Sequence, residues 1–356
     1  MPRIPIIFAD AISAAGSTIP QALETLFQAR QPFEMPTHFD AHDTPHGLCE
    51  LPPYEHSRSF ALLDVIVGRL PKLPEDTHLF LASTVGAIDL LERQTDDEPL
   101  DCLQILLNYA QERTGLRQAT LVAAACASGQ NAIALACGEI AAGDCRNALV
   151  IGIDITSEFV TAGFTSLGAV SRSLPRPYSV ERDGLLLGEG CGALLLAEQA
   201  QNPLATVIGT TSSCDASHIT APDLAGTHLA KTIRDCLAQA NLEADQLGAI
   251  LGHGTGTFYN DQAELAALNA VVPTALPLFS LKANTGHTMG ASGVLQIAYA
   301  PQLMKHGKLP PSAGVITPED SAREFLEKRE IKSPFFLSLN IGFGGLNSAI
   351  ILEVAQ

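Results

Sequence analysis

The side chain best suited to nucleophilic chemistry is Cys126, which follows a short apolar run at residues 120–125. Ala, Ile and Leu recur at helical spacing over residues 132–142, so the pattern predicts that a strand turns into a helix at Cys126. The unpaired N–H groups and positive dipole end of a helix favour the thiolate, which is the nucleophilic form of cysteine. A lone cysteine in a tight turn is more often a small buried side chain, so a catalytic role depends on other residues.

Two histidines and a lysine lie in glycine-rich turns much further along the chain. His253 lies in the turn at residues 252–257, and Lys282 and His287 lie in the stretch at residues 282–293. A third glycine-rich turn spans residues 340–347. Each of them follows a predicted strand, and strand ends are where α/β sheets build their sites. Two histidines in such turns, together with a thiol at a helix start, predict one shared site.

The composition favours a layered α/β protein. Hydrophobic residues make up 46% of the 356 and charged residues 17%, and the 29 glycines with no Trp suit close packing of helices on strands. The net charge of −17 argues against nucleic acid or an anionic membrane as a partner. No stretch reaches the roughly 20 apolar residues of a membrane span, and the N-terminal apolar run is too short for a signal peptide.

The cysteine and histidine patterns predict no metal site. The eight cysteines include no CxxC pair, so neither a zinc site nor a disulfide framework is indicated, and a reduced, cytoplasmic environment is expected. Residues 30–55 are rich in proline and are predicted to form an irregular surface segment. Four histidines lie in or just after this segment, at His38, His42, His46 and His56. Their spacing defines no set of metal ligands.

Strands and helices alternate in both parts of the chain. The run at residues 147–154 reads as a buried parallel strand, and residues 226–240 and 291–306 read as helices. The repeated element order predicts a duplicated architecture, with a first half at residues 1–200 that carries the cysteine and a second half at 201–356 that carries both histidines and the lysine.

The ordered set of motifs resembles the β-ketoacyl-acyl carrier protein synthases, which have a thiolase-like fold. The matching stretches occur in the family's order and are residues 125–129, 176–190, 253–264, 282–287 and 342–347. The resemblance implies an α/β fold of two pseudo-duplicated βα halves in five αβαβα layers. A cysteine with two histidines is similar to the elongating class of these condensing enzymes.

The resemblance implies an acyltransferase that carries out a decarboxylative Claisen condensation in fatty acid or type II polyketide chain elongation. Cys126 would accept an acyl chain from a carrier-protein thioester, and malonyl-acyl carrier protein would then lose carbon dioxide and attack that acyl group. His253 and His287 would polarise the malonyl thioester oxygen. The backbone N–H groups of Cys126 and Phe343 would form the oxyanion hole.

Other roles follow from the same resemblance. Lys282 would order the site through Glu264 and bias the protonation of the histidines, and Phe343 would also act as a gate beside the thiol. No metal or resident cofactor is implied, because phosphopantetheine arrives on the carrier protein. The candidate substrate contacts, with the threonines assigned to the pantetheine arm, are Thr255, Thr257 and Gly344.

Two departures from the family concern partners. A few tens of residues fewer precede Cys126 than in typical members, and the strongly acidic charge opposes docking of an acidic acyl carrier protein unless a basic patch offsets it. The candidates for that patch are Arg58, Arg69, Arg113, Arg117, Arg172 and Arg176.

These departures keep an alternative open, a chain-length-factor-like subunit of a heterodimeric ketosynthase, for example of the aryl polyene type. Such a subunit shapes the tunnel with little condensing activity of its own. Chain-length factors usually lack the active cysteine, so the retained Cys126 favours the enzyme. The resemblance implies a dimer, either of two identical chains or with a second ketosynthase subunit.

Overall fold

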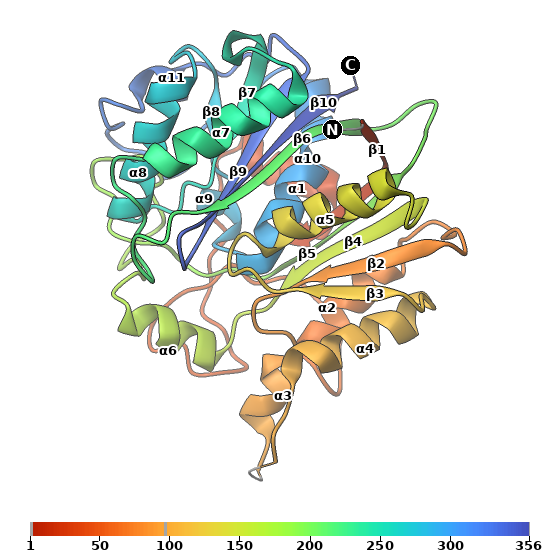
Figure 1. The fold of residues 1–356 in the computed structure, drawn as a ribbon. Coiled ribbons are helices and arrows are strands. Elements are labelled where there is room, and N and C mark those ends of the chain that lie inside the picture. The colour runs from red at the N-terminus through yellow and green to blue at the C-terminus, as the bar shows by residue number, and fades with distance from the viewer. Residues whose placement is uncertain (1–2, 96–97, 356) are drawn as a thin grey trace.

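The computed structural model describes residues 3–95 and 98–355, and its strands form one ten-stranded sheet in the order β3-β2-β4-β5-β1-β6-β10-β9-β7-β8 (Figure 1). The first five strands come from one half of the chain and the last five from the other. In chain order the strands are β1 (Ile4–Ser13), β2 (Thr77–Ala82), β3 (Ala119–Val122), β4 (Asn147–Asp154), β5 (Gly190–Ala197), β6 (Ala205–Cys214), β7 (Leu247–Leu251), β8 (Leu278–Phe279), β9 (Phe335–Gly342) and β10 (Leu346–Val354).

The two halves repeat one topology. In the first half β2 lies parallel to β3 and β4, and β5 lies antiparallel to β4 and β1. In the second half β7 lies parallel to β8 and β9, and β10 lies antiparallel to β9 and β6. The halves meet where Ile4–Ile6 of β1 pairs antiparallel with Ala205–Val207 of β6. The duplicated fold class predicted from element order is confirmed.

Helices cover and separate the two half-sheets in five layers (Figure 1). One apolar core between the half-sheets contains side chains of α1 (Ile19–Phe27), α5 (Ser128–Ala142) and α10 (Ser292–His306). A second core packs α2 (Arg58–Val67) and α4 (Cys102–Thr114) on the outer face of the first half-sheet. A third packs α7 (Thr227–Ala240) and α8 (Phe258–Val271) on the second.

The two central helices cross closely because the chain has small residues at the crossing. A Cβ added at Gly293 of α10 would lie 2.8 Å from the backbone nitrogen of Gln130 in α5, which is closer than packed atoms approach. α10 is apolar on nearly every side, as expected for a helix with sheets on both sides. The close crossing brings the N-terminal ends of α5 and α10, and the turns before them, to one place.

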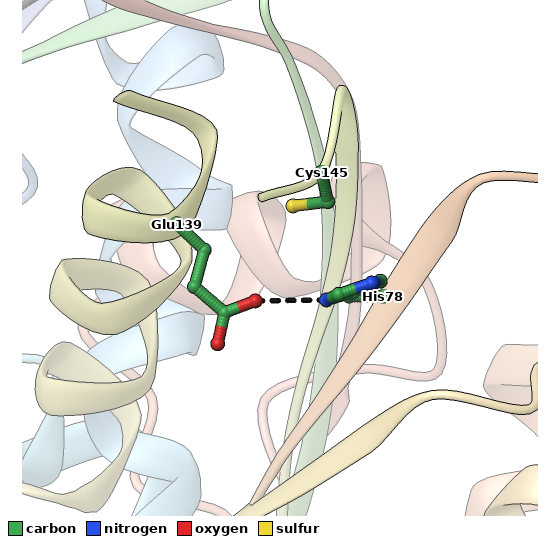
Figure 2. A group of neighbouring side chains, drawn as sticks. All are labelled: His78, Glu139 and Cys145. Atoms are coloured by element: carbon green, nitrogen blue, oxygen red, sulfur yellow. Dashed lines mark hydrogen bonds and ion pairs between the residues drawn. The ribbon is translucent and has the colours of Figure 1, made fainter. Parts of the chain in front are cut away.

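The far end of α5 is tied to the first half-sheet by a polar contact. Glu139 lies in the last turn of α5, and its carboxylate lies 2.8 Å from Nδ1 of His78 on β2. Figure 2 shows these two side chains with Cys145, which lies between α5 and β4. This contact belongs to the opposite end of α5 from Cys126.

The sequence predicted the main elements with modest errors. The strand predicted at residues 147–154 matches β4, although β4 is parallel only to β2 and antiparallel to β5. Residues 30–55 are irregular, as predicted, but they are not all at the surface, because His46 is fully buried. Four short helices are α3 (Ile88–Arg93), α6 (Glu158–Ser166), α9 (Lys282–Thr285) and α11 (Arg323–Glu327). Of these, only α6 falls where the sequence indicates a loop or a short helix, at residues 159–170. Among the described helices, none is long and apolar enough to cross a membrane.

Candidate active site

Cys126 lies in a sharp turn between β3 and α5. The preceding Ala125 has a φ of 48°, a left-handed conformation that is rare for a residue with a side chain and that clusters at functional sites. Ser128 stabilises the turn, since its Oγ donates to the Ala125 carbonyl at 2.6 Å and accepts from the Ala124 N–H at 2.8 Å. The strand-to-helix turn expected at Cys126 is therefore present.

The Cys126 thiol meets His287 across the interface between the halves. Sγ of Cys126 lies 2.9 Å from Nε2 of His287, and both side chains are buried. Burial raises the pKa of the Cys126 thiol to about 12, although the positive charge of Lys282 opposes this. Burial thus disfavours the thiolate that the helix end and Lys282 favour. The thiol becomes nucleophilic when it passes its proton on, and Nε2 of His287 is in position to accept it.

Nδ1 of His287 faces the hydroxyl of Ser292, which in turn contacts the hydroxyl of Thr288. Ser292 Oγ lies 3.4 Å from Nδ1 and 3.0 Å from Thr288 Oγ1. A hydroxyl can rotate to donate or accept, so this pair accommodates either tautomer of the neutral ring. Burial, and then the charge of Lys282, hold the pKa of His287 well below its usual value, so the ring is neutral at pH 7.

Lys282 orders the second histidine. Its Nζ lies 2.6 Å from the His253 carbonyl oxygen and 3.2 Å from Nδ1 of the His253 ring. An ammonium group has no acceptor, so Nδ1 must accept and the proton of the neutral ring lies on Nε2. Burial and the charge of Lys282 also hold the pKa of His253 well below its usual value. The two rings lie nearly perpendicular, with centroids 5.6 Å apart.

Glu264 orders the backbone at His253 rather than contacting Lys282. Its carboxylate accepts from the His253 N–H at 2.6 Å, the Gly254 N–H at 2.8 Å and the Tyr178 hydroxyl at 3.0 Å. The ion pairs and hydrogen bonds of the described residues include none between Glu264 and Lys282, although the buried carboxylate acts on that charge electrostatically. Tyr178 lies in the matching stretch at residues 176–190, but the sequence does not reveal its role, because its partner Glu264 lies 86 residues further along the chain.

A cavity of about 450 Å³ opens onto the cysteine and both histidines. Thr255 and Thr257 line it, and their hydroxyls lie 2.8 Å apart. Phe343 also lines it, but Gly344 does not, and the Gly344 N–H donates to the Ile219 carbonyl at 2.7 Å. A substrate contact through Gly344 stays a prediction, and it cannot use the N–H that is already bonded to Ile219.

Phe343 packs beside a residue that the sequence did not reveal. The ring of Phe164 on α6 lies 5.7 Å from that of Phe343 and 6.2 Å from that of His287. Phe164 lines the cavity with them. No motif surrounds Phe164, so only the fold places it at the site.

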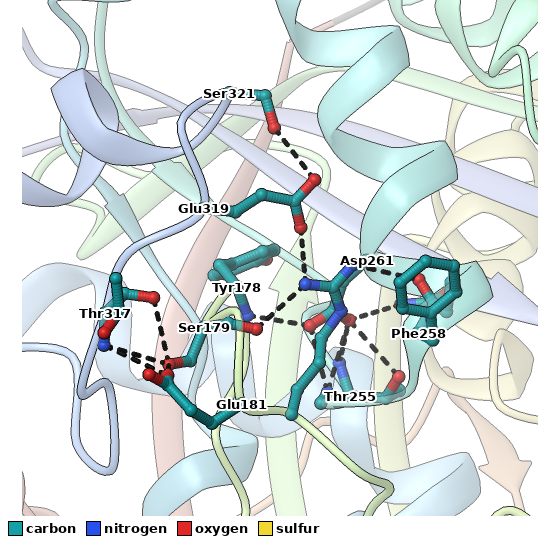
Figure 3. Close-up of polar contacts among 12 residues, drawn as sticks. Tyr178, Ser179, Glu181, Thr255, Phe258, Asp261, Thr317, Glu319 and Ser321 are labelled. Carbon is teal, nitrogen blue, oxygen red and sulfur yellow. Dashed lines mark hydrogen bonds and ion pairs between the residues drawn. The ribbon is translucent and has the colours of Figure 1, made fainter.

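A buried polar network holds the turn that carries the threonines (Figure 3). Asp261 accepts from the N–H groups of Tyr178 and Thr255 at 2.8 and 3.0 Å. Arg182 pairs with Glu319 and donates to the Phe258 carbonyl at 3.3 Å. Three distant segments, near residues 180, 257 and 319, are thereby joined at one side of the cavity.

The six arginines proposed for docking do not share one environment. Arg58 is buried, and its guanidinium makes two hydrogen bonds of 2.7 Å to the buried Glu189, so its predicted docking role is wrong. A buried, paired charge cannot reach a partner. The remaining five differ in exposure: Arg69 and Arg113 form ion pairs with Asp10 and Asp64, Arg117 and Arg172 are exposed, and Arg176 is half-buried.

The duplicated fold, with a cysteine and two histidines facing one cavity, defines a protein of the thiolase-like class. Residues 114–202 match the family model of the beta-ketoacyl synthase N-terminal domain, and residues 204–315 match that of the C-terminal domain. The two matches together cover more than half of the chain. The chain belongs to the beta-ketoacyl synthase family.

Relatives and solved structures agree with this membership. The chain is 32% identical over 257 residues to the actinorhodin polyketide beta-ketoacyl synthase 1 of Streptomyces coelicolor, covering 67% of this chain and 55% of that one. It is 29% identical to the malonyl-ACP decarboxylase PksF of Bacillus subtilis, covering 67% and 61%. The chain thus spans little more than half the length of these relatives. A chain in the structure of a ketosynthase in complex with its chain length factor, from Xenorhabdus doucetiae, shares the fold with a TM-score of 0.86 at 24% identity, covering 99% and 98%.

Proposed function

We propose that this protein is a β-ketoacyl-acyl carrier protein synthase that condenses an acyl-Cys126 intermediate with malonyl-acyl carrier protein. The observation that carries the proposal is the contact of 2.9 Å between Cys126 Sγ and His287 Nε2 in a cavity that His253 also lines. A nucleophile, a proton acceptor and a second donor at one cavity wall are what this chemistry requires.

In the loading step the Cys126 sulfur attacks the thioester carbonyl of an acyl-carrier protein. His287 accepts the thiol proton at Nε2 as the carbon–sulfur bond forms, and it returns the proton to the departing pantetheine sulfur. The backbone N–H groups of Cys126 and Phe343 are proposed to stabilise the tetrahedral oxyanion. The products are acyl-Cys126 and free carrier thiol.

In the condensation step malonyl-carrier protein loses carbon dioxide, and the electrons of the broken bond form an enolate at its thioester. The Nε2–H of His253 stabilises that enolate oxygen, because Lys282 fixes the proton on this nitrogen. His287 can donate to the same oxygen, since the Ser292 hydroxyl at its Nδ1 permits the Nε2–H tautomer. The enolate carbon attacks the acyl carbonyl, Cys126 leaves as thiolate, and a proton from water restores the thiol.

We propose that these steps need no resident metal or cofactor, and that the pantetheine arm of the carrier enters past Thr255 and Thr257. The proposed partners are an acyl carrier protein and a second ketosynthase-type chain, either identical or different. Arg172 remains the exposed docking candidate nearest the cavity, since its N–H donates to the cavity-lining Asp183. We expect the protein to act in the cytoplasm.

Intact-mass analysis of the purified protein with acyl-carrier protein tests the function. We expect one acyl adduct on Cys126, followed by 3-oxoacyl-carrier protein and carbon dioxide when malonyl-carrier protein is added. The chain-length-factor-like subunit would be favoured by two results together. The chain alone would form no acyl adduct, and it would form a tight heterodimer with a second ketosynthase whose own cysteine is acylated. Absence of loading in both settings would overturn both functions.

A further inference from the structure

Three potential metal ligands meet at the C-terminal end of α5, the end opposite Cys126, and Figure 2 shows their side chains. They are His78 on β2, Glu139 in the last turn of α5 and Cys145 in the loop before β4. One donor atom from each lies within 4.8 Å of the other two, and Nδ1 of His78 lies 2.8 Å from the Glu139 carboxylate. Among the residues that the structure describes, this is the one such group of three found.

The backbone itself brings the cysteine to this place. The N–H of Asp144 donates to the Glu139 carbonyl at 3.0 Å, so the chain leaves α5 in a tight turn and Cys145 follows directly. β2 lies parallel to β4, with Thr77 beside Asn147, which places His78 next to that loop. Three separate elements therefore hold the three side chains.

Hydrogen bonding accounts for His78 and Glu139 but not for Cys145. The histidine and carboxylate satisfy each other, whereas no hydrogen bond of the Cys145 sulfur is found among the described residues. Cys145 is buried, and Figure 2 shows its sulfur near His78 and Glu139. A buried sulfur beside a histidine and a carboxylate is a ligand set that a cation can complete.

The charge around the group favours a cation. The carboxylates of Glu139, Asp76 and Asp144 all act electrostatically on the Cys145 sulfur. The negative dipole end of α5 also lies here, since Glu139 belongs to its last turn. One nitrogen, one oxygen and one sulfur ligand suit Zn²⁺ better than the hard cations Mg²⁺ and Ca²⁺, which take oxygen ligands.

We propose that His78, Glu139 and Cys145 bind Zn²⁺, with water in the fourth position. Zinc bonds of about 2.0 to 2.3 Å place tetrahedral ligand atoms roughly 3.3 to 3.7 Å apart. The Cys145 sulfur must therefore approach the other two donor atoms, whereas His78 Nδ1 and the Glu139 oxygen, now 2.8 Å apart, must separate slightly. Cys145 loses its proton on binding. The ion links α5 to β2 and to the loop before β4. The site lies at the opposite end of α5 from Cys126, so its role is to stabilise the fold.

The sequence predicted no metal site because these ligands lack any motif. Positions 78, 139 and 145 are separated by 61 and 6 residues, and neither spacing is that of a zinc motif. Only the parallel pairing of β2 with β4 makes them neighbours. The site is independent of the proposed condensation and would exist even if that function were wrong.

Cobalt substitution tests the site with a signal specific to a thiolate ligand. Co²⁺ added to the metal-free protein should give a near-ultraviolet sulfur-to-metal charge-transfer band, and Cys145→Ser should abolish it. Cys214→Ser removes the exposed thiol and Cys126→Ser removes the thiol beside His287, so both controls should keep the band. Loss of the band in either control, with retention in Cys145→Ser, would overturn the proposal.

Zinc affinity and thermal unfolding provide a second measurement. Competition with a chromophoric chelator should show one Zn²⁺ per chain. Cys145→Ser should weaken Zn²⁺ binding by more than roughly 100-fold, which is more than the loss usually caused by replacing a residue that only hydrogen-bonds to a ligand. Zn²⁺ should raise the melting temperature of the parent chain and of the half-exposed control His42→Gln, but not of Glu139→Gln. Equal affinity in the parent chain and both ligand variants would mean adventitious binding and would refute the site.

Discussion

Nε2 of His287 lies 2.9 Å from the Cys126 sulfur, and each residue comes from a different half of the duplicated chain. The cysteine follows β3 in the first half-sheet, and the histidine follows β8 in the second. Burial raises the pKa of the thiol, so the proton must leave before the sulfur can attack. The histidine is therefore expected to control how fast Cys126 is acylated.

Replacing His287 should slow acylation more than replacing His253. We expect His287→Ala to reduce the rate of Cys126 acylation by about 10²- to 10⁴-fold, the usual contribution of a general base. His253→Ala is the matched control, because Lys282 rather than Cys126 is the side chain hydrogen-bonded to its ring. Time-resolved intact mass measures both rates. Equal loading by the parent chain and His287→Ala would show that the thiol is activated in another way.

Removing the nucleophile should separate decarboxylation from condensation. Cys126→Gln cannot form the acyl intermediate, but it leaves His253 and Lys282 in place to stabilise the enolate. We expect no 3-oxoacyl product and an unchanged or higher rate of carbon dioxide release from malonyl-carrier protein. Carbon dioxide trapping and product mass measure the two. Retained condensation would exclude Cys126 as the nucleophile.

Lys282 should set the alkaline limit of decarboxylation. Burial lowers the pKa of Lys282, with Glu264 opposing the shift, so the ammonium loses its proton below the pH at which an exposed lysine does. Decarboxylation that needs the ammonium should then fall as pH rises through this lowered pKa. Lys282→Met should lower the rate by about 10²-fold and flatten that limb. A parent profile that stays flat up to pH 10 would contradict this role.

Close backbone packing behind His287 should make Gly188 intolerant of a side chain. The Gly188 N–H donates to the His287 carbonyl, and a Cβ at Gly188 would lie 2.0 Å from the Thr285 carbonyl oxygen. We expect Gly188→Ala to destabilise the protein by about 1 to 3 kcal/mol and to slow acylation. Gly138→Ala, on the exposed side of α5 with open space, should instead stabilise by about 0.5 to 1 kcal/mol. Chemical denaturation compares them.

Burial of His46 should make the fold sensitive to acid. Burial lowers the pKa of His46 in the folded protein to about 4. Between pH 6.5 and 4 this side chain is therefore protonated in the unfolded chain but neutral in the folded protein. The free energy of unfolding should therefore be fully retained above pH 6.5 and fall by roughly 3 kcal/mol between pH 6.5 and 4 from this residue alone. His46→Gln should lose that part of the slope, whereas His42→Gln should keep it. Equal slopes in all three would refute the assignment.

The sequence predicted the parts of the site that lie in turns with strong local signals. The glycine-rich turns around His253 and His287 and the strand-to-helix turn at Cys126 follow from spacing and residue type, and the ordered motifs supplied the family. The element order also predicted the duplication, because each element buries an apolar face whose period is visible along the chain.

Long-range pairing explains what the sequence could not predict. From the sequence alone Arg58 is expected at the surface, because its buried partner Glu189 lies 131 residues further along the chain. Phe164 has no motif, and its place beside Phe343 depends on where α6 packs. Gly344 belongs to a motif that reaches the cavity, yet its own N–H bonds Ile219. A sequence motif therefore identifies which loop lies at the cavity. Which side chains and backbone groups of that loop point into the cavity depends on their hydrogen-bond and packing partners.

The shared strand order of the two halves relates them by an approximate twofold rotation, since the equivalent strands β1 and β6 pair antiparallel. β3 and β8 are equivalent, as are α5 and α10, so the turn bearing Cys126 and the turn bearing His287 are counterparts. Proton transfer between sulfur and imidazole thus crosses the rotation axis. The two equivalent turns therefore carry different side chains, so the acid comes from one copy of the repeated fold and its base from the other.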